Sequence, residues 1–255
     1  MELAEVINSP YFIAIIFFVI AFVYSSVGMG GGSSYTAMMA IMGFSALAIP
    51  MISLSLNLLV TTIGSFNFVR SKHFRWRLIT PFIITSIPMS YLGGSLHLPK
   101  EIFYWVLMVS LCFIAIRIYF WRDTKLSFDI SDRGKLWVSL IAGSILGLVA
   151  GIAGIGGAVY LVPLIILLGL GSAKQAAACG VVFVWLNSLF GLLSRLQYNP
   201  MELGVFPYLA VAVVLGALMG SYLGAFKYSA KKMEKILGII ILVAIVALSR
   251  KLFIL

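Results

Sequence analysis

Apolar residues run along the chain in long blocks separated by short polar stretches. A bilayer core of about 30 Å needs roughly 20 apolar residues of helix, so most of these blocks can cross a membrane. Two of them, 33–43 and 158–170, are too short to cross, and each follows a cluster of glycines. The pattern predicts an all-α polytopic membrane protein. The ten blocks are 11–27, 33–43, 47–69, 78–96, 102–121, 136–150, 158–170, 173–194, 204–226 and 236–249.

The composition agrees with a membrane protein. Of the 255 residues, 62% are hydrophobic and only 10% are charged. The N-terminus carries Glu2 and Glu5 but lacks the basic region of a cleaved signal peptide, so we expect residue 1 to be retained. The net charge of +10 comes from basic residues that fall between the apolar blocks. We therefore expect the lipid bilayer, and no nucleic acid, as a partner.

The two halves of the chain resemble each other. Three stretches match: "GMGGG" at 28–32 with "GIGGA" at 154–158, "LN" at 56–57 with "LN" at 186–187, and "SYLG" at 90–93 with "SYLG" at 221–224. The spacing grows from 126 to 131 residues, which an insertion of about one helical turn explains. We expect a first transmembrane repeat at 1–122, a linker at 123–135 and a second repeat at 136–255.

Basic residues indicate how the two repeats are oriented. The segment 70–77 holds four Lys or Arg residues, whereas its counterpart 195–203 holds one. The bias is reversed in the next pair, where 97–101 holds one and 227–235 holds four. The positive-inside rule then places 70–77, 227–235 and the linker 123–135 in the cytoplasm, with both termini outside. The repeats should therefore be inverted, each with a glycine-broken helix pair followed by three long transmembrane helices. The sequence leaves open whether each broken pair is a re-entrant hairpin or adds a tilted crossing.

The glycine clusters should unwind the helices that contain them. Four of the five residues at 28–32 are glycine, and each glycine costs a helix about 1 kcal/mol. Unwound backbone survives at membrane depth only inside protein or beside a wet cavity. The short helix that follows begins with free N–H groups at the positive end of its dipole, which favours an anion. In inverted-repeat transporters two such half-helices meet near the midplane.

We therefore predict a substrate site at the two breaks, with polar side chains from the long helices. Ser33 and Ser34 supply hydroxyls after the first break, and Asn57 and Asn187 match across the repeat. Each asparagine has a plain alternative role, which is to bond a neighbouring helix. The predicted substrate-binding residues are Gly28, Gly30, Gly31, Gly32, Ser33, Ser34, Asn57, Gly154, Gly156, Gly157 and Asn187.

Close helix packing is the competing explanation for any glycine in a membrane helix. Glycines spaced four apart fit that role, and two such sets occur. Arg195 ends its apolar block, where we expect its side chain to extend to the membrane surface. The two sets are Gly143, Gly147 and Gly151, and Gly216, Gly220 and Gly224.

Two halves that each open on a glycine-rich break, "GMGGGSS" and "GIGGAVYLVP", resemble the TauE/SafE family of sulfite exporters, also called the 4-toluene sulfonate uptake permease family. The similarity covers nearly the whole chain. Pro163 stands where the family pattern has a proline, whereas the first half has Ala37 there. The resemblance implies a transporter in the plasma (inner) membrane of a bacterium or archaeon, with sulfur-containing anions such as sulfite or organosulfonates as cargo.

Other classes of function fit the sequence less well. The segment "GMGGGS" lacks the third glycine of a dinucleotide-binding motif and follows an apolar block. Every Asp and Glu lies in a loop or at the end of a block, so we expect no enzyme, no metal site and no cofactor. An anion-selective channel is the alternative to a secondary transporter of small anions. A homo-oligomer is compatible with the sequence.

Overall fold

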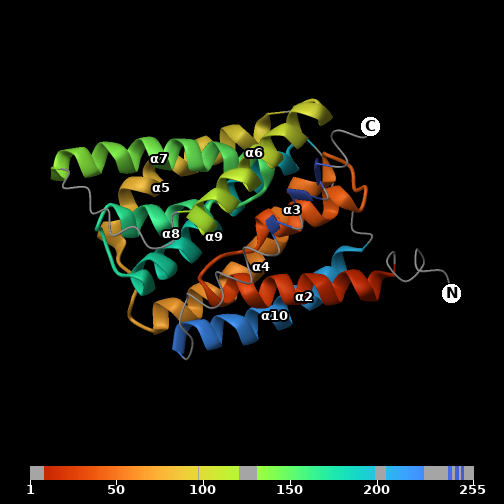
Figure 1. Cartoon of the computed structure of the whole chain (residues 1–255), viewed down its shortest axis with the longest axis horizontal. Helices are drawn as coiled ribbons and strands as arrows, with labels where there is room; N and C mark the ends of the chain where they lie inside the picture. Colours follow the sequence, from red (N-terminus) through yellow and green to blue (C-terminus); the bar gives the residue numbers. More distant parts are fainter. Residues whose placement is uncertain are drawn as a thin grey trace.

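The computed structural model describes residues 9–96, 98–120, 131–198 and 205–226, with 241–242, 245–246 and 248–249. This part of the chain contains nine α-helices and no strand, which confirms the all-helical class (Figure 1). The predicted block 236–249 lies largely outside the described residues, as do 123–130 and 227–235. The helices are α2 (Pro10–Ser26), α3 (Gly32–Ile41), α4 (Ala48–Arg70), α5 (Trp76–Ser95), α6 (Lys100–Phe120), α7 (Asp132–Ala153), α8 (Ala158–Leu167), α9 (Ala173–Leu196) and α10 (Phe206–Phe226).

Several helices have the length and composition of membrane spans. By these two criteria α4, α7, α9 and α10 are candidates to cross a bilayer. The outer surface carries large apolar side chains such as Ile84, Val109 and Val211, each at least 60% exposed. A surface of this kind suits contact with lipid. The structure is that of a multi-pass membrane protein.

Glycines spaced four apart hold the outer helix pairs together. Each of Gly143, Gly147 and Gly151 of α7 faces a backbone carbonyl of α5, and an added Cβ there would overlap with it. The corresponding set on α10 faces the carbonyls of Phe18, Phe22 and Ser26 on α2 in the same way. The packing role predicted for these two sets is therefore confirmed. Figure 1 shows α2 beside α10 on one side of the molecule and α5 beside α7 on the other.

The directions of the helices follow from their contacts. Helix α5 runs parallel to α9, because Gly171 just before α9 contacts Leu78 at the start of α5, and Gln197 after α9 donates to Tyr91 near its end. Since α4 ends at the turn that leads into α5, α4 and α9 run in opposite directions. Near the C-terminal end of α4, the Asn67 amide donates to the Ser221 hydroxyl, which lies near the C-terminal end of α10.

The two short helices begin and end alike. Helices α3 and α8 both contain 10 residues, and each begins after a glycine in the left-handed region, Gly31 with φ 97° and Gly157 with φ 83°. This backbone conformation favours glycine because a Cβ strains it. Gly43 and Gly169, which follow the two helices, also have positive φ. Helix α8 contains Pro163 where α3 has Ala37, and the two helices are nevertheless equal in length.

Candidate substrate site

The two glycine breaks lie against each other in the interior. A Cβ added to Gly32 would lie 2.6 Å from the carbonyl oxygen of Gly154 and 2.7 Å from that of Ile155. Residues 28–37 and 150–159 are all buried. The breaks therefore meet backbone to backbone, and only a residue without a side chain fits at Gly32.

Asn57 of α4 occupies the place where the breaks meet. A Cβ added to Gly30 would lie 2.6 Å from Asn57 Oδ1, and one added to Gly156 would lie 3.1 Å from Asn57 Nδ2. This amide nitrogen donates to the carbonyl of Gly154 at 3.3 Å, and Ser53, one turn earlier in α4, donates to the same oxygen at 2.8 Å. Asn57 Oδ1 is buried and has no partner among the described residues. One amide therefore contacts both breaks and keeps an unused polar atom.

The N-termini of α3 and α8 leave several backbone donors unused. Within the described part of the chain, the N–H groups of residues 30–33 and of residues 155–159 donate to no acceptor. These residues are buried, and buried N–H groups in proteins nearly always have a partner. Each set also lies at the positive end of a helix dipole. The arrangement is chemically suited to an anion that would accept hydrogen bonds from both breaks.

The two serines after the first break are bound to a tyrosine of α2. The Tyr24 hydroxyl lies 2.7 Å from Ser33 Oγ and 2.7 Å from Ser34 Oγ, and all three side chains are buried. A hydroxyl can donate only one hydrogen bond, so Tyr24 donates to at most one serine. At most one of these serines therefore keeps its proton for a ligand. Tyr24 itself was missing from the sequence-based site.

Three of the predicted glycines pack against residues other than Asn57. A Cβ added to Gly28 would meet the backbone of Ala177 in α9, and one added to Gly157 would meet the ring of Phe183. A Cβ added to Gly31 would meet the ring of Tyr35 in its own helix. These glycines hold the conformation of the breaks, whereas Gly30, Gly32, Gly154 and Gly156 lie around Asn57.

Asn187 is not placed like Asn57. Its side-chain amide nitrogen donates to the backbone carbonyl of Phe183 at 2.8 Å, within α9, while the backbone carbonyl of Asn187 accepts from the Ser90 hydroxyl of α5. Helices α4 and α9 start 125 residues apart, whereas the two asparagines are 130 apart. Phe183 and Val184 occupy the part of α9 that contacts the breaks. The plain role of bonding within and between helices accounts for the contacts of Asn187, although its Oδ1 is buried without a partner among the described residues.

Arg195 does not extend to the membrane surface, and the prediction that it would do so is wrong. Its side chain is only 6% exposed. The guanidinium donates to the carbonyl of Gly151 at 3.0 Å and to that of Ile152 at 2.8 Å. These carbonyls belong to the last turn of α7, where the helix supplies no N–H donors for its final carbonyls. Arg195 therefore caps α7 directly before the second break.

The described helices, four of them candidate membrane spans around two buried glycine breaks, have the features of a polytopic membrane protein. The sequence model of the sulfite exporter TauE/SafE family matches residues 13–248. The chain belongs to this family, and it is a multi-pass membrane transporter.

Two relatives agree with this assignment. A probable membrane transporter protein of Sinorhizobium fredii is 37% identical over 235 residues, which cover 91% of this chain and 95% of the relative. A probable membrane transporter protein of Methanocaldococcus jannaschii is 28% identical over 200 residues, which cover 72% of each chain. No solved structure matches the chain.

Proposed function

We propose that this protein is a secondary transporter of small anions, with sulfur oxyanions such as sulfite or organosulfonates as cargo, bound between the two glycine breaks. The observation that carries the proposal is the set of buried backbone N–H groups at residues 30–33 and 155–159 that have no acceptor among the described residues. An oxyanion offers several acceptor oxygens and would supply these partners. The family description adds sulfite as the first cargo to test.

Burial of the breaks favours a carrier over a channel. Both breaks are buried along their whole length, so an anion held there is closed off from water in this state. A carrier passes through such a closed state in every cycle, whereas an open channel does not require one. Saturable flux is the behaviour that this proposal expects.

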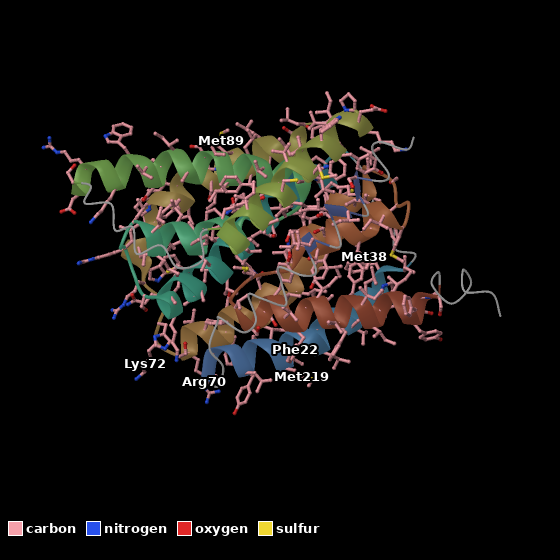
Figure 2. The ribbon with its side chains drawn as sticks, viewed as in Figure 1. Phe22, Met38, Arg70, Lys72, Met89 and Met219 are labelled. Atoms are coloured by element: carbon pink, nitrogen blue, oxygen red, sulfur yellow. The ribbon has the colours of Figure 1, made fainter. Side chains whose placement is uncertain are left out.

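Inverted repeats are the second part of the proposal. The opposite directions of α4 and α9 support it, as do the paired contacts of α5 with α7 and of α2 with α10. In a bacterial or archaeal plasma membrane, the positive-inside rule would put the end bearing Arg70 and Lys72 in the cytoplasm (Figure 2). After Cys112 and Cys179 are replaced, an impermeant thiol reagent added outside should label Tyr198→Cys but not Lys72→Cys. Labelling of Lys72→Cys in intact cells would contradict this orientation.

Gly30→Ala tests the anion site most cleanly. Gly30 is not among the glycines with positive φ, so alanine adds a methyl group without backbone strain. The methyl group would lie 2.6 Å from Asn57 Oδ1 and 2.9 Å from Val184 Cγ1, in the space between the breaks. Because the Asn57 and Val184 side chains must shift to admit the methyl group, we expect sulfite uptake into proteoliposomes to fall at least tenfold in a protein that still folds.

Gly64→Ala is the matched control for that experiment. This glycine also lies buried in the bundle, in α4, and an added Cβ would meet only Val181, at 3.0 Å. Uptake by this variant should stay within twofold of the unaltered protein. Equal uptake by Gly30→Ala and Gly64→Ala, with both proteins folded, would argue that the anion passes elsewhere.

A further inference from the structure

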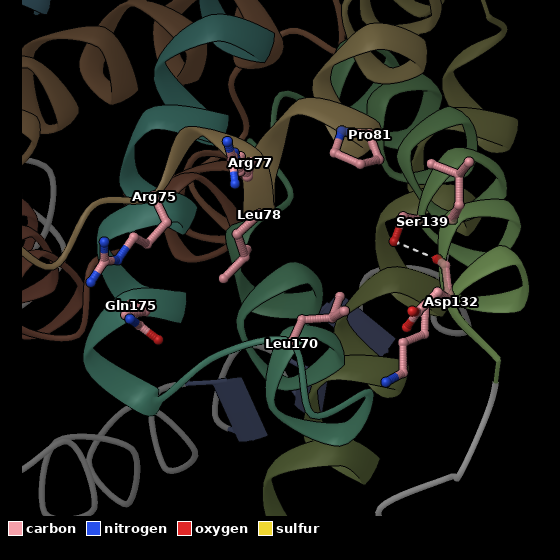
Figure 3. Close-up of a pocket in the computed structure, with 10 residues that line it drawn as sticks. Arg75, Arg77, Leu78, Pro81, Asp132, Ser139, Leu170 and Gln175 are labelled. Carbon is pink, nitrogen blue, oxygen red and sulfur yellow. Dashed lines mark hydrogen bonds between the residues drawn. The ribbon is translucent and has the colours of Figure 1, made fainter.

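A cavity lies at the end of the molecule where α5, α7 and α9 begin. It has a volume of about 520 Å³, and its lining comes from the starts of α5, α7 and α9 and from the turn between α8 and α9 (Figure 3). The glycine breaks do not contribute to this lining. The cavity is therefore separate from the candidate substrate site.

Positive charge dominates the polar part of this cavity. Arg75, Arg77 and Lys135 line it together with a single carboxylate, Asp132. The N-termini of α5, α7 and α9 all lie at this end, and each adds the positive pole of a helix dipole. Such a combination attracts an anionic group.

The floor of the same cavity is apolar. Leu78, Pro81, Leu136 and Leu170 line it, so the charged groups form only part of the wall. Figure 3 shows Leu170 between Gln175 on one side and Asp132 on the other. A small, fully hydrated anion gains nothing from this apolar floor, whereas a ligand with a charged group and an apolar part uses both.

Exposed side chains beside the cavity place it at the membrane surface. Trp76 at the start of α5 is 62% exposed and Trp137 near the start of α7 is 65% exposed. Tryptophan is enriched where the bilayer meets water. Further along these two helices, Ile84 and Ile141 are also exposed and would face the hydrocarbon core. Acyl chains could therefore lie along α5 and α7 directly next to the basic rim.

We propose that this cavity binds the phosphate headgroup of an anionic phospholipid, with Arg77 and Lys135 as its principal cationic contacts. Basic pockets between membrane helices bind anionic lipid headgroups by this combination of charge and apolar contact. The lipid would join the start of α5 to the start of α7. This proposal does not depend on the identity of the transported anion.

The test compares two double variants of the full chain in detergent. Arg77→Gln/Lys135→Gln removes two charges from the cavity, and Arg70→Gln/Arg133→Gln removes two exposed charges from the same end that do not line it. Each protein is titrated with short-chain phosphatidylglycerol or phosphatidylcholine while its melting temperature is followed. We expect the apparent affinity for phosphatidylglycerol to fall about fivefold for each charge removed from the cavity, and to change less than twofold in the control.

Two further arms make the result decisive. The charge-preserving variant Arg77→Lys/Lys135→Arg should keep the preference for phosphatidylglycerol, and soluble glycerol phosphate should not reproduce the stabilisation. Equal losses in both double variants, or no loss in either, would overturn the proposal. Full stabilisation by glycerol phosphate alone would overturn it too, because the cavity would then be a site for free anions.

Discussion

The two glycine breaks have similar backbones and different surroundings. Both precede a helix of 10 residues, and Gly28 and Gly31 have positive φ like their counterparts Gly154 and Gly157, whereas Gly156 has positive φ and its counterpart Gly30 does not. After the first break come Ser33 and Ser34, which are bonded to Tyr24, whereas Val159 and Tyr160 stand at the matching places after the second, and the Tyr160 hydroxyl donates away to Ser110 of α6. The polar side chains near the site thus belong mostly to the first break.

At the second break, a buried charged side chain binds the helix end that directly precedes the break. Arg195 binds the last turn of α7, while the first break has no buried basic side chain among the described residues. If the proposed anion site is right, the two breaks divide its work: the backbone of both breaks would provide donors, the side chains at the first break would select the anion, and Arg195, which binds the end of α7, would fix the second break in place. Three pairs of variants test this division.

The largest effect should come from the two arginines that end the long helices α4 and α9. Arg195→Gln leaves the carbonyls of Gly151 and Ile152 with weaker partners or none, whereas Arg70→Gln alters an exposed side chain. Hydrogen bonds to a charged group contribute about 1.5–3 kcal/mol each, part of which offsets the cost of burying the charge. We expect the free energy of unfolding in micelles to fall by about 3 kcal/mol for Arg195→Gln and by less than about 0.5 kcal/mol for Arg70→Gln. Equal stabilities would mean that Arg195 does not fix the second break.

An intermediate effect should separate the two asparagines. Asn57→Leu removes the amide that contacts both breaks, whereas Asn187→Leu removes one that bonds its own helix. Loss of a hydrogen bond to an anion weakens binding by about 2 kcal/mol, or roughly 30-fold. We expect Asn57→Leu to raise the dissociation constant for sulfite by this factor, and Asn187→Leu to change it less than threefold. A larger loss of sulfite affinity in Asn187→Leu than in Asn57→Leu would indicate that the anion binds nearer the middle of α9.

The smallest effect should distinguish two buried tyrosines. Tyr24→Phe removes the hydroxyl that orients Ser33 and Ser34 in the proposed site, whereas Tyr160→Phe removes a 2.8 Å bond from α8 to the carbonyl of Ser110 in α6. A neutral hydrogen bond contributes about 1 kcal/mol, so Tyr24→Phe should weaken sulfite binding about fivefold. Tyr160→Phe should leave the affinity unchanged while lowering the melting temperature slightly. If both variants lost affinity equally, the polar character of the first break would not matter.

The sequence predicts the parts of this arrangement that depend on local rules. Clustered glycines cannot continue a helix, so the breaks and the short helices that follow them were predictable. Glycines spaced four apart face one neighbour, and the packing of α7 on α5 and of α10 on α2 follows from that spacing.

Features that depend on packing were not predictable in the same way. Repeated "LN" pairs made Asn57 and Asn187 look equivalent, but α9 starts 125 residues after α4, so Asn187 lies about one turn further along its helix than Asn57 does. Arg195 sits at a span end, where the usual rule sends an arginine to the surface. Its burial depends on the last carbonyls of α7, which have no donor within their own helix and lie 43 and 44 positions earlier in the chain.

The most direct test of the central claim is to observe the backbone donors themselves. With the protein labelled at glycine with ¹⁵N in micelles, a sulfite titration would be followed through the amide resonances. We predict saturable shifts at Gly30, Gly31 and Gly32 of the first break and at Gly156 and Gly157 of the second, with Gly43 and Gly169 unchanged. A saturable titration that left these five glycines unmoved and shifted resonances elsewhere would contradict an anion site between the two breaks.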